Sequence, residues 1–294
     1  MSNVVKKSDV QKMYPQRDTF SHKGENGRIL IIGGSINYFG APILAALGAL
    51  GSGADLVYLL VPECNFEVSR SFYPDFIVRK YAGDFINEKT VAAAEELFEK
   101  VDCILMGPGV SEGPESLDAI TKIAQMAPCP VVLDAEAIPA IAKLGLAQGS
   151  PQETEERAEK FTITPHRGEM DLITEGQLPD NLSEMIKIVN DFSRKWGVTI
   201  LLKGHTDMIA APNRQIILNE TGNPGMTVGG TGDVLAGIVA SLIAQQIPAY
   251  EACQCAAFLN GIAGDNLVRQ KGFNFSGTDL ALELPYSIYS ILGR

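Results

Sequence analysis

The sequence predicts an α/β fold with a mostly parallel central sheet and helices on both of its faces. Short β-type runs alternate with longer helical patterns along most of the 294 residues, and 46% of the residues are hydrophobic. Some strand-type runs, such as Arg28–Ile32, are apolar at nearly every position. Such runs are typical of parallel strands buried on both faces. We expect residues 1–294 to form a single domain around one sheet.

The first strand, helix and strand set the pattern for the rest of the chain. Arg28–Ile32 is a buried strand that runs into two glycines, and a helix follows from about Pro42 to a stop at Gly51 and Gly53. The next strand is Leu56–Val61. The same alternation predicts helices at 91–100, 115–126 and 182–196, and strands at 102–106, 131–133, 161–164 and 198–202.

The pattern changes after residue 202. The runs 208–211 and 215–218 flank Pro212-Asn213-Arg214 and predict a hairpin, which would give the sheet an antiparallel edge. Long apolar helices are expected at 231–247 and 249–270, and a last helix at 278–292. The charge-rich segment 145–160 is expected to be a solvated excursion and not a domain linker.

Composition and charge exclude several classes of protein. The chain has 24 Lys and Arg against 35 Asp and Glu, a net charge of −11, so it lacks a basic surface for nucleic acid or an anionic membrane. Its longest nearly apolar stretch, Val234–Ile247, is shorter than the roughly 20 residues that a membrane-spanning helix needs. The N-terminus has no apolar secretory signal, and the cysteines show no metal-binding spacing. We expect a cytoplasmic protein.

The glycine-rich segment 219–237 gives the clearest indication of chemistry. Its glycines surround the start of a long helix, where backbone amides can approach a ligand closely and the helix dipole favours negative charge. Gly230, Thr231 and Gly232 could surround a phosphate, and Asp233 could accept a proton from a substrate hydroxyl. Alternatively, Thr231 is an N-cap and Asp233 only complements the helix dipole. No Walker A motif is present.

These residues resemble a known family. GGTGDVLAG is similar to the anion-hole motif of the ribokinase-like superfamily, and TGNPGMTVGGTGD closely resembles the ADP/ATP-dependent NAD(P)H-hydrate dehydratases. Further segments agree in order: HKGENGRILIIGGS, YFGAPILAA, MGPGV, VVLDAEAI, TPHRGEM and LLKGHTDMIA. The resemblance covers residues 22–237 and implies a ribokinase-like fold.

The resemblance also implies a repair reaction, that of a nucleotide-dependent lyase. The substrate is (6S)-NADH hydrate or (6S)-NADPH hydrate, written NADHX and NADPHX. ADP or ATP would phosphorylate the ring hydroxyl, and the lone pair of the ring nitrogen would then expel phosphate to restore NADH or NADPH. Asp233 would be the general base, with Gly230, Thr231 and Gly232 as the anion hole. Mg²⁺ is expected to neutralise the nucleotide phosphates. The family also implies a homo-oligomer, expected to be a homotetramer.

By the same resemblance, other residues fall into three groups. The residues expected to contact the hydrate are Ala41, Gly109, His166 and Asp233. Those expected to contact the nucleotide are Lys203, Gly204, His205, Thr206, Asp207 and Gly232. Candidate metal ligands are Asp134, Glu136 and Glu169, although Glu136 stands where the family usually has aspartate. Plain structural roles are the alternatives: strand-to-helix turns, a structural histidine, a solvated lysine and a helix N-terminal carboxylate.

Two other functions remain open. A small-molecule kinase of the same superfamily, acting on a sugar or vitamin precursor, would use the same GTGD loop, but the TGNPGM, TPHRGEM and LLKG segments favour the dehydratase. A catalytically inactive nucleotide-binding regulator would have no need of Asp233. About 27 residues precede the first strand, so no N-terminal epimerase domain is expected. The other epimer would then depend on a separate epimerase or on slow spontaneous exchange.

Overall fold

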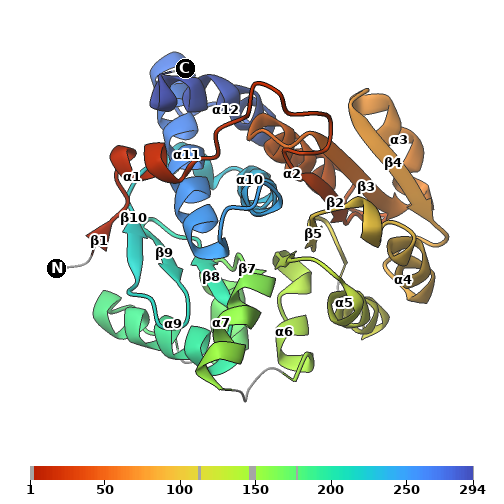
Figure 1. Cartoon of the computed structure of the whole chain (residues 1–294), viewed down its shortest axis with the longest axis horizontal. Helices are drawn as coiled ribbons and strands as arrows, with labels where there is room; N and C mark the ends of the chain where they lie inside the picture. The colour runs from red at the N-terminus through yellow and green to blue at the C-terminus, as the bar shows by residue number, and fades with distance from the viewer. Residues whose placement is uncertain (1–2, 112–113, 146–149, 177, 294) are drawn as a thin grey trace.

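A computed structural model of the chain describes residues 3–111, 114–145, 150–176 and 178–293. In these residues ten strands form one sheet in the order β1-β10-β9-β8-β7-β6-β5-β2-β3-β4 (Figure 1). The strands are β1 Asn3–Val4, β2 Arg28–Ile32, β3 Leu56–Pro62, β4 Phe76–Tyr81, β5 Cys103–Met106, β6 Val131–Leu133, β7 Phe161–Ile163, β8 Thr199–Leu202, β9 Asp207–Ala210 and β10 Ile217–Asn219. Strands β2 to β8 pair in parallel, and β9 runs antiparallel to β8 and β10. The predicted parallel sheet with an antiparallel edge is confirmed.

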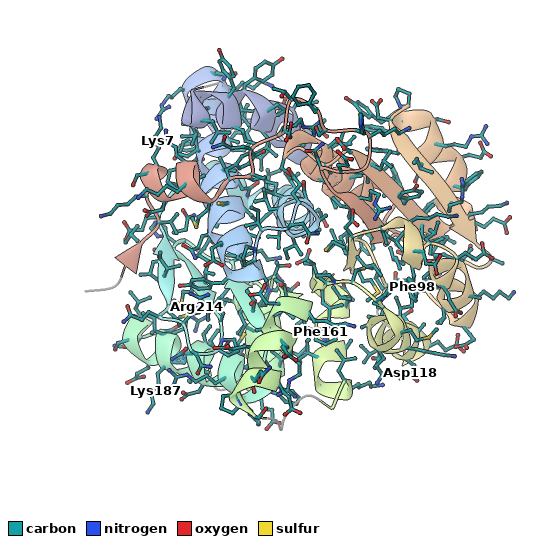
Figure 2. The ribbon with its side chains drawn as sticks, viewed as in Figure 1. Lys7, Phe98, Asp118, Phe161, Lys187 and Arg214 are labelled. Atoms are coloured by element: carbon teal, nitrogen blue, oxygen red, sulfur yellow. The ribbon has the colours of Figure 1, made fainter. Side chains whose placement is uncertain are left out.

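Helices cover both faces of this sheet. They are α1 Lys7–Met13, α2 Gly40–Gly51, α3 Phe66–Phe72, α4 Glu88–Glu95, α5 Pro114–Met126, α6 Ala140–Lys143, α7 Pro151–Lys160, α8 Arg167–Ile173, α9 Leu182–Trp196, α10 Thr231–Ala244, α11 Ala249–Lys271 and α12 Gly277–Leu292. One buried apolar cluster lies beneath α2, α10, α11 and α12, and a second lies beneath α4, α5, α6 and α9 (Figure 1). Charged side chains such as Lys7, Asp118 and Lys187 lie at the periphery (Figure 2).

Strand β2 shows why the sheet is buried on both sides. Successive side chains of a strand point to opposite faces. Ile29 and Ile31 therefore belong to the cluster under α2 and α10, and Leu30 and Ile32 to the cluster under α4 and α5. All four side chains have no exposed surface. A strand that is apolar at every position fits only such a central place in the sheet.

Glycines allow α2 and α10 to approach closely. A Cβ atom built on Gly48 would lie 2.4 Å from the carbonyl oxygen of Val234, and one on Gly237 would lie 2.0 Å from that of Ala45. Both positions are too tight for any side chain. The helix whose first turn carries Asp233 is therefore fixed against the helix that follows β2.

Several elements differ from the sequence prediction. The helix expected at 91–100 is α4, followed by a short 3₁₀ helix at Phe98–Lys100. The charged segment 145–160 forms the mostly exposed helix α7 from residue 151, with a capping box of Ser150 and Glu153, and residues 146–149 lie outside the described residues. Strands β1 and β4 and helices α1, α3, α6 and α8 were not predicted. In the part of the chain that the structure describes, no helix has the length and apolarity required to cross a membrane.

Candidate active site

The predicted site residues lie at one edge of the sheet. Ala41 follows β2, Gly109 follows β5, Asp134 follows β6, His166 follows β7 and Lys203 follows β8. These strands are parallel, so their carboxyl ends meet at the same edge, where open α/β sheets bind ligands. Residues that are far apart in the sequence are thereby gathered into one site.

The start of α10 contains the residues predicted to form the anion hole, Gly230, Thr231 and Gly232. The helix begins at Thr231, and its N-cap is Gly230, whose φ of +97° favours glycine. The hydroxyl of Thr231 donates to the carbonyl oxygens of Met226, at 2.8 Å, and Val228, at 3.1 Å. Thr231 therefore secures the preceding loop and is not the N-cap considered from the sequence. The N-terminal amides of α10 make no bond to a capping side chain, which suits a phosphate ligand.

Asp233 lies in the first turn of α10, where its carboxylate is partly buried. Burial raises the pKa of Asp233 from 3.8 to about 7, the nearby carboxylates of Asp134 and Glu136 also raise it, and Lys203 lowers it. A general base works best when its pKa lies near the operating pH. Asp233 therefore has the properties of a base that can take a proton from an alcohol.

Lys203 connects the two halves of the site. Its ammonium nitrogen lies 2.8 Å from Oδ1 of Asp134 and 4.0 Å from Oε2 of Glu169. A Cβ atom built on Gly232 would lie 3.5 Å from the same nitrogen, so Lys203 reaches the first turn of α10. Burial alone would lower the pKa of Lys203, but Asp134, Glu169 and Asp233 together raise it above its ordinary value. The lysine is therefore a permanent positive charge at this point.

His166 and Glu169 form the next part of the site. His166 is the N-cap of α8: its Nδ1 accepts from the amide of Glu169 at 3.1 Å, and its own amide donates to Oε2 of Glu169 at 2.6 Å. Its Nε2 lies 3.2 Å from Oε1 of Glu169, yet 59% of the His166 side chain is exposed. The predicted substrate residue thus also has a structural role, and it still presents a surface to a ligand.

Ala41 and Gly109, both predicted to contact the hydrate, lie side by side. A Cβ atom built on Gly109 would lie 3.1 Å from Cβ of Ala41 and 3.0 Å from the carbonyl oxygen of Tyr38. Gly109 has a φ of +69°, so both conformation and space favour glycine here. Asn65 holds the same loop by donating to the carbonyl oxygens of Ser35, at 3.0 Å, and Tyr38, at 3.4 Å.

The turn between β8 and β9 contains the other predicted nucleotide residues. Asp207 accepts from the amide of Gly204 and from the side chain of Asn219, both at 3.0 Å, so its carboxylate braces the turn. Burial raises the pKa of Asp207 despite these bonds. Gly204 and His205 are exposed, and Thr206 is half-buried. Of these residues, the exposed ones are the more accessible to a nucleotide.

Other residues that shape the site were missed from the sequence. Asp265, on α11, holds the loop before α10: it accepts from Asn223 Nδ2 at 3.0 Å and from the amide of Gly222 at 3.3 Å. Thr164 donates to Asp134 at 2.8 Å. Thr164 begins the TPHRGEM segment, but its bond to Asp134 could not be predicted because the two residues are 30 positions apart, and no local pattern marks Asp265. The signal that could have pointed to Asp265 is Asn223 in TGNPGM, because a side-chain amide in a loop needs a hydrogen-bond partner.

A cavity of about 830 Å³ opens beside His166 and Glu169. Its volume is within the range of small-molecule sites, roughly 300–1,000 Å³. The lining residues are Val110, Ser111, Ser116, Leu117, Ala135, Glu136, Ile138, Pro139, His166, Gly168, Glu169 and Leu172. The site therefore has room for a ligand much larger than a single ring.

The candidate metal ligands do not form a cage. Asp134 and Glu169 face Lys203, and Glu136 is exposed at the cavity wall. Among the described residues, no group of three or more His, Cys, Asp or Glu side chains could hold a metal ion. Since Mg²⁺ is usually bound through one or two carboxylates together with substrate phosphates, this arrangement fits an ion that arrives with a nucleotide.

A family profile described as NAD(P)H-hydrate dehydratase matches residues 29–286. The chain belongs to this family. It is 38% identical to a Nitrosopumilus maritimus protein named ADP-dependent (S)-NAD(P)H-hydrate dehydratase, over 94% of this chain and 93% of that protein. Four other archaeal relatives, named bifunctional NAD(P)H-hydrate repair enzyme Nnr, are 35% to 37% identical over 92% to 97% of this chain. This member of the dehydratase family spans about half of their length, 51% to 56%.

Solved structures agree with the family. The ADP/ATP-dependent NAD(P)H-hydrate dehydratase from Bacillus subtilis, co-crystallised with ATP and Mg²⁺, has a TM-score of 0.81 and 25% identity, and the match covers 99% of both chains. A ribokinase-like superfamily protein from Enterococcus faecalis has a TM-score of 0.83 and 27% identity, over 99% of this chain and 97% of that one. The predicted ribokinase-like fold is thus confirmed for this dehydratase-family chain.

Proposed function

We propose that this chain is a lyase that dehydrates the (S) forms of NADH hydrate and NADPH hydrate, with ADP or ATP as phosphoryl donor. The observation that supports it most is a carboxylate with a pKa of about 7, Asp233, beside Lys203 in the first turn of a helix whose amides are uncapped. The substrate and the phosphoryl donor in this proposal come from the names of the two relatives that this chain matches over nearly their whole length.

The reaction would take place in two steps. Asp233 accepts the proton of the hydrate's ring hydroxyl while that oxygen attacks the terminal phosphorus of the nucleotide, and the bond from this phosphorus to the bridging oxygen breaks. The amides of Gly230, Thr231 and Gly232, together with Lys203, stabilise the charge on the transferring group. In the second step the ring nitrogen's lone pair expels phosphate, which leaves a cationic iminium ring, and loss of a proton from the adjacent ring carbon to water restores the reduced nicotinamide ring.

Phosphorylation has a clear chemical purpose in this scheme. Hydroxide is a poor leaving group, whereas phosphate leaves with its charge spread over several oxygens. Bound Mg²⁺ would neutralise the nucleotide phosphates, with the exposed carboxylate of Glu136 as the protein's contribution to holding it. Ala41, Gly109 and His166 would contact the hydrate, and the cavity beside His166 would take the rest of the dinucleotide. The turn from Lys203 to Asp207 would contact the nucleotide.

Further parts of the proposal concern the setting of the enzyme. We propose that residues 1–294 act as one dehydratase unit in the cytoplasm, and that the other epimer is converted to the S form by an epimerase or by slow spontaneous exchange. We also propose a homotetramer, as the family resemblance implies. Self-association is supported by α12, which exposes Leu282, Tyr286 and Tyr289, spaced as on one face of a helix. A second copy would cover this apolar surface.

Product stoichiometry tests this function against an alcohol kinase. Purified protein is mixed with NADH hydrate, Mg²⁺ and ATP, and the products are quantified by chromatography and a phosphate assay. The dehydratase should form one NADH, one ADP and one inorganic phosphate per turnover. A stable phosphorylated product without inorganic phosphate, or no reaction with the hydrate, would contradict the proposal.

A further inference from the structure

We propose that Asp134 is a positioning residue that holds the ammonium group of Lys203 against Gly232, at the phosphate-binding end of α10. From the sequence, Asp134 is a candidate metal ligand. Its contacts in the folded chain indicate a different role. The kinetic part of this inference rests on the proposed function, whereas the binding part does not.

The carboxylate of Asp134 is buried and bonded to other side chains. Its side chain is 3% exposed, and Oδ1 accepts from Thr164 Oγ1 and from Lys203 Nζ, each at 2.8 Å. Thr164 is itself fully buried. A buried carboxylate requires a partner of opposite charge, and removing one partner of such a pair is costly. Asp134 and Lys203 therefore fix each other.

Lys203 needs such a partner because of its own chemistry. A lysine side chain has four flexible carbons and a strongly hydrated ammonium group, so without a partner it would adopt many conformations. Glu169 lies 4.0 Å from this ammonium group, farther than Asp134, and makes its short bond to the backbone of His166 instead. Asp134 is the group that sets the position of the lysine.

The position that results is close to the phosphate-binding turn. The Cβ site of Gly232 lies 3.5 Å from Lys203 Nζ. A phosphate held by the first-turn amides of α10 would lie within reach of this ammonium group. When the nucleotide binds, Lys203 would not have to leave the carboxylate, because an ammonium group has three donor hydrogens.

The test compares Asp134→Asn with a matched pair elsewhere in the molecule. Arg28 and Asp102 form an ion pair at the amino ends of β2 and β5, with bonds of 2.6 Å and 2.9 Å, away from the site. Binding of Mg·ADP and Mg·ATP is measured by calorimetry, and steady-state kinetics with NADH hydrate gives kcat and KM. Asp134→Asn should weaken nucleotide binding by about 30-fold, the loss typical of one charge-assisted contact, and leave the KM for the hydrate within about twofold. Asp102→Asn should lower the melting temperature without changing the nucleotide affinity or the KM for the hydrate.

A double-mutant cycle separates positioning from general damage. If Asp134 acts through Lys203, then Asp134→Asn added to Lys203→Gln should weaken nucleotide binding no further than Lys203→Gln alone. Additive losses, or unchanged nucleotide affinity in Asp134→Asn, would overturn the inference. Should Asp134→Asn fail to fold, Thr164→Val takes its place, because it removes one bond to Asp134. This variant should weaken nucleotide binding by several-fold, and unchanged nucleotide affinity would overturn the inference. Wild-type protein could also bind nucleotide without turning over the hydrate. If the affinities of the variants then still show that the two substitutions are not additive, the proposed function fails and the positioning role stands.

Discussion

Asp233→Asn should make the protein more stable at neutral pH while it abolishes turnover. Asparagine has nearly the same shape as aspartate but cannot ionise. In the folded chain the pKa of Asp233 is raised from 3.8 to about 7, chiefly by burial. Between these two values the folded chain keeps a proton that the unfolded chain has lost. Stability from this group is therefore full below the lower value and declines as the pH rises to the upper one.

The size of the effect follows from that interval. Each pH unit between the two pKa values lowers the free energy of unfolding by about 1.4 kcal/mol, so the loss from Asp233 between pH 5 and pH 8 is at most about 3 kcal/mol. The melting temperature of Asp233→Asn should therefore gain on that of wild type by roughly 5 °C over this range. Comparing the two proteins at each pH cancels the contributions of every other titrating group.

Thermal unfolding, followed by circular dichroism at pH 5, 6, 7 and 8, measures this difference directly. Among these four pH values the gap between the two melting temperatures should be smallest at pH 5, and it should widen up to about pH 7. A gap that stays constant with pH, or that narrows as pH rises, would refute the reasoning. In that case Asp233 would be an ordinary surface carboxylate, without the raised pKa on which its role as base depends.

Further predictions concern rate, binding and packing. Below pH 7 the wild-type kcat/KM should fall about tenfold per pH unit as Asp233 is protonated, and a flat profile down to pH 5 would exclude it as the base. Gly232→Val would place a branched side chain beside Lys203, where it should block the approach of phosphate to the first-turn amides, and calorimetry should show nucleotide affinity at least about tenfold lower. His166→Ala should raise the KM for the hydrate more than that for the nucleotide, whereas equal changes would indicate a purely structural histidine. Gly48→Ala should lower the melting temperature, because its Cβ would meet a carbonyl oxygen at 2.4 Å, and Gly40→Ala, with open space around it, should not.

The central sheet could be predicted because its strands are apolar on both faces. β2 and β6 and helix α9 begin and end where the sequence predicts, since continuous apolar runs and a strongly amphipathic helix leave few alternatives. Strand β4 was missed because it lies at the edge of the sheet, where β3 is its one neighbour among the described strands, and because it exposes Arg79 and Lys80. Because of these polar positions, β4 lacks the continuous apolar run by which the other strands were predicted.

The site could be predicted only as far as its motifs extend. The glycine-rich loop located Asp233 and the amides before it, because that chemistry is contained in a few consecutive residues. The pairing of Asp134 with Lys203 could not be predicted, since the two residues are 69 positions apart and meet only when β6, β7 and β8 align. Asp265 illustrates the same limit, because its partner Asn223 lies on another element 42 positions away.

The most direct test of the central claim is the recovery of reduced-nicotinamide absorbance from NADH hydrate. Wild-type protein and Asp233→Asn are each mixed with the hydrate and Mg²⁺, with ADP, ATP or no nucleotide in separate cuvettes. Wild type should restore the absorbance with at least one nucleotide and not without it, and Asp233→Asn should bind that nucleotide but restore the absorbance several orders of magnitude more slowly. Failure of wild type to restore it with either nucleotide, or equal rates for the two proteins, would contradict the assignment of Asp233 as the base of a nucleotide-dependent dehydratase.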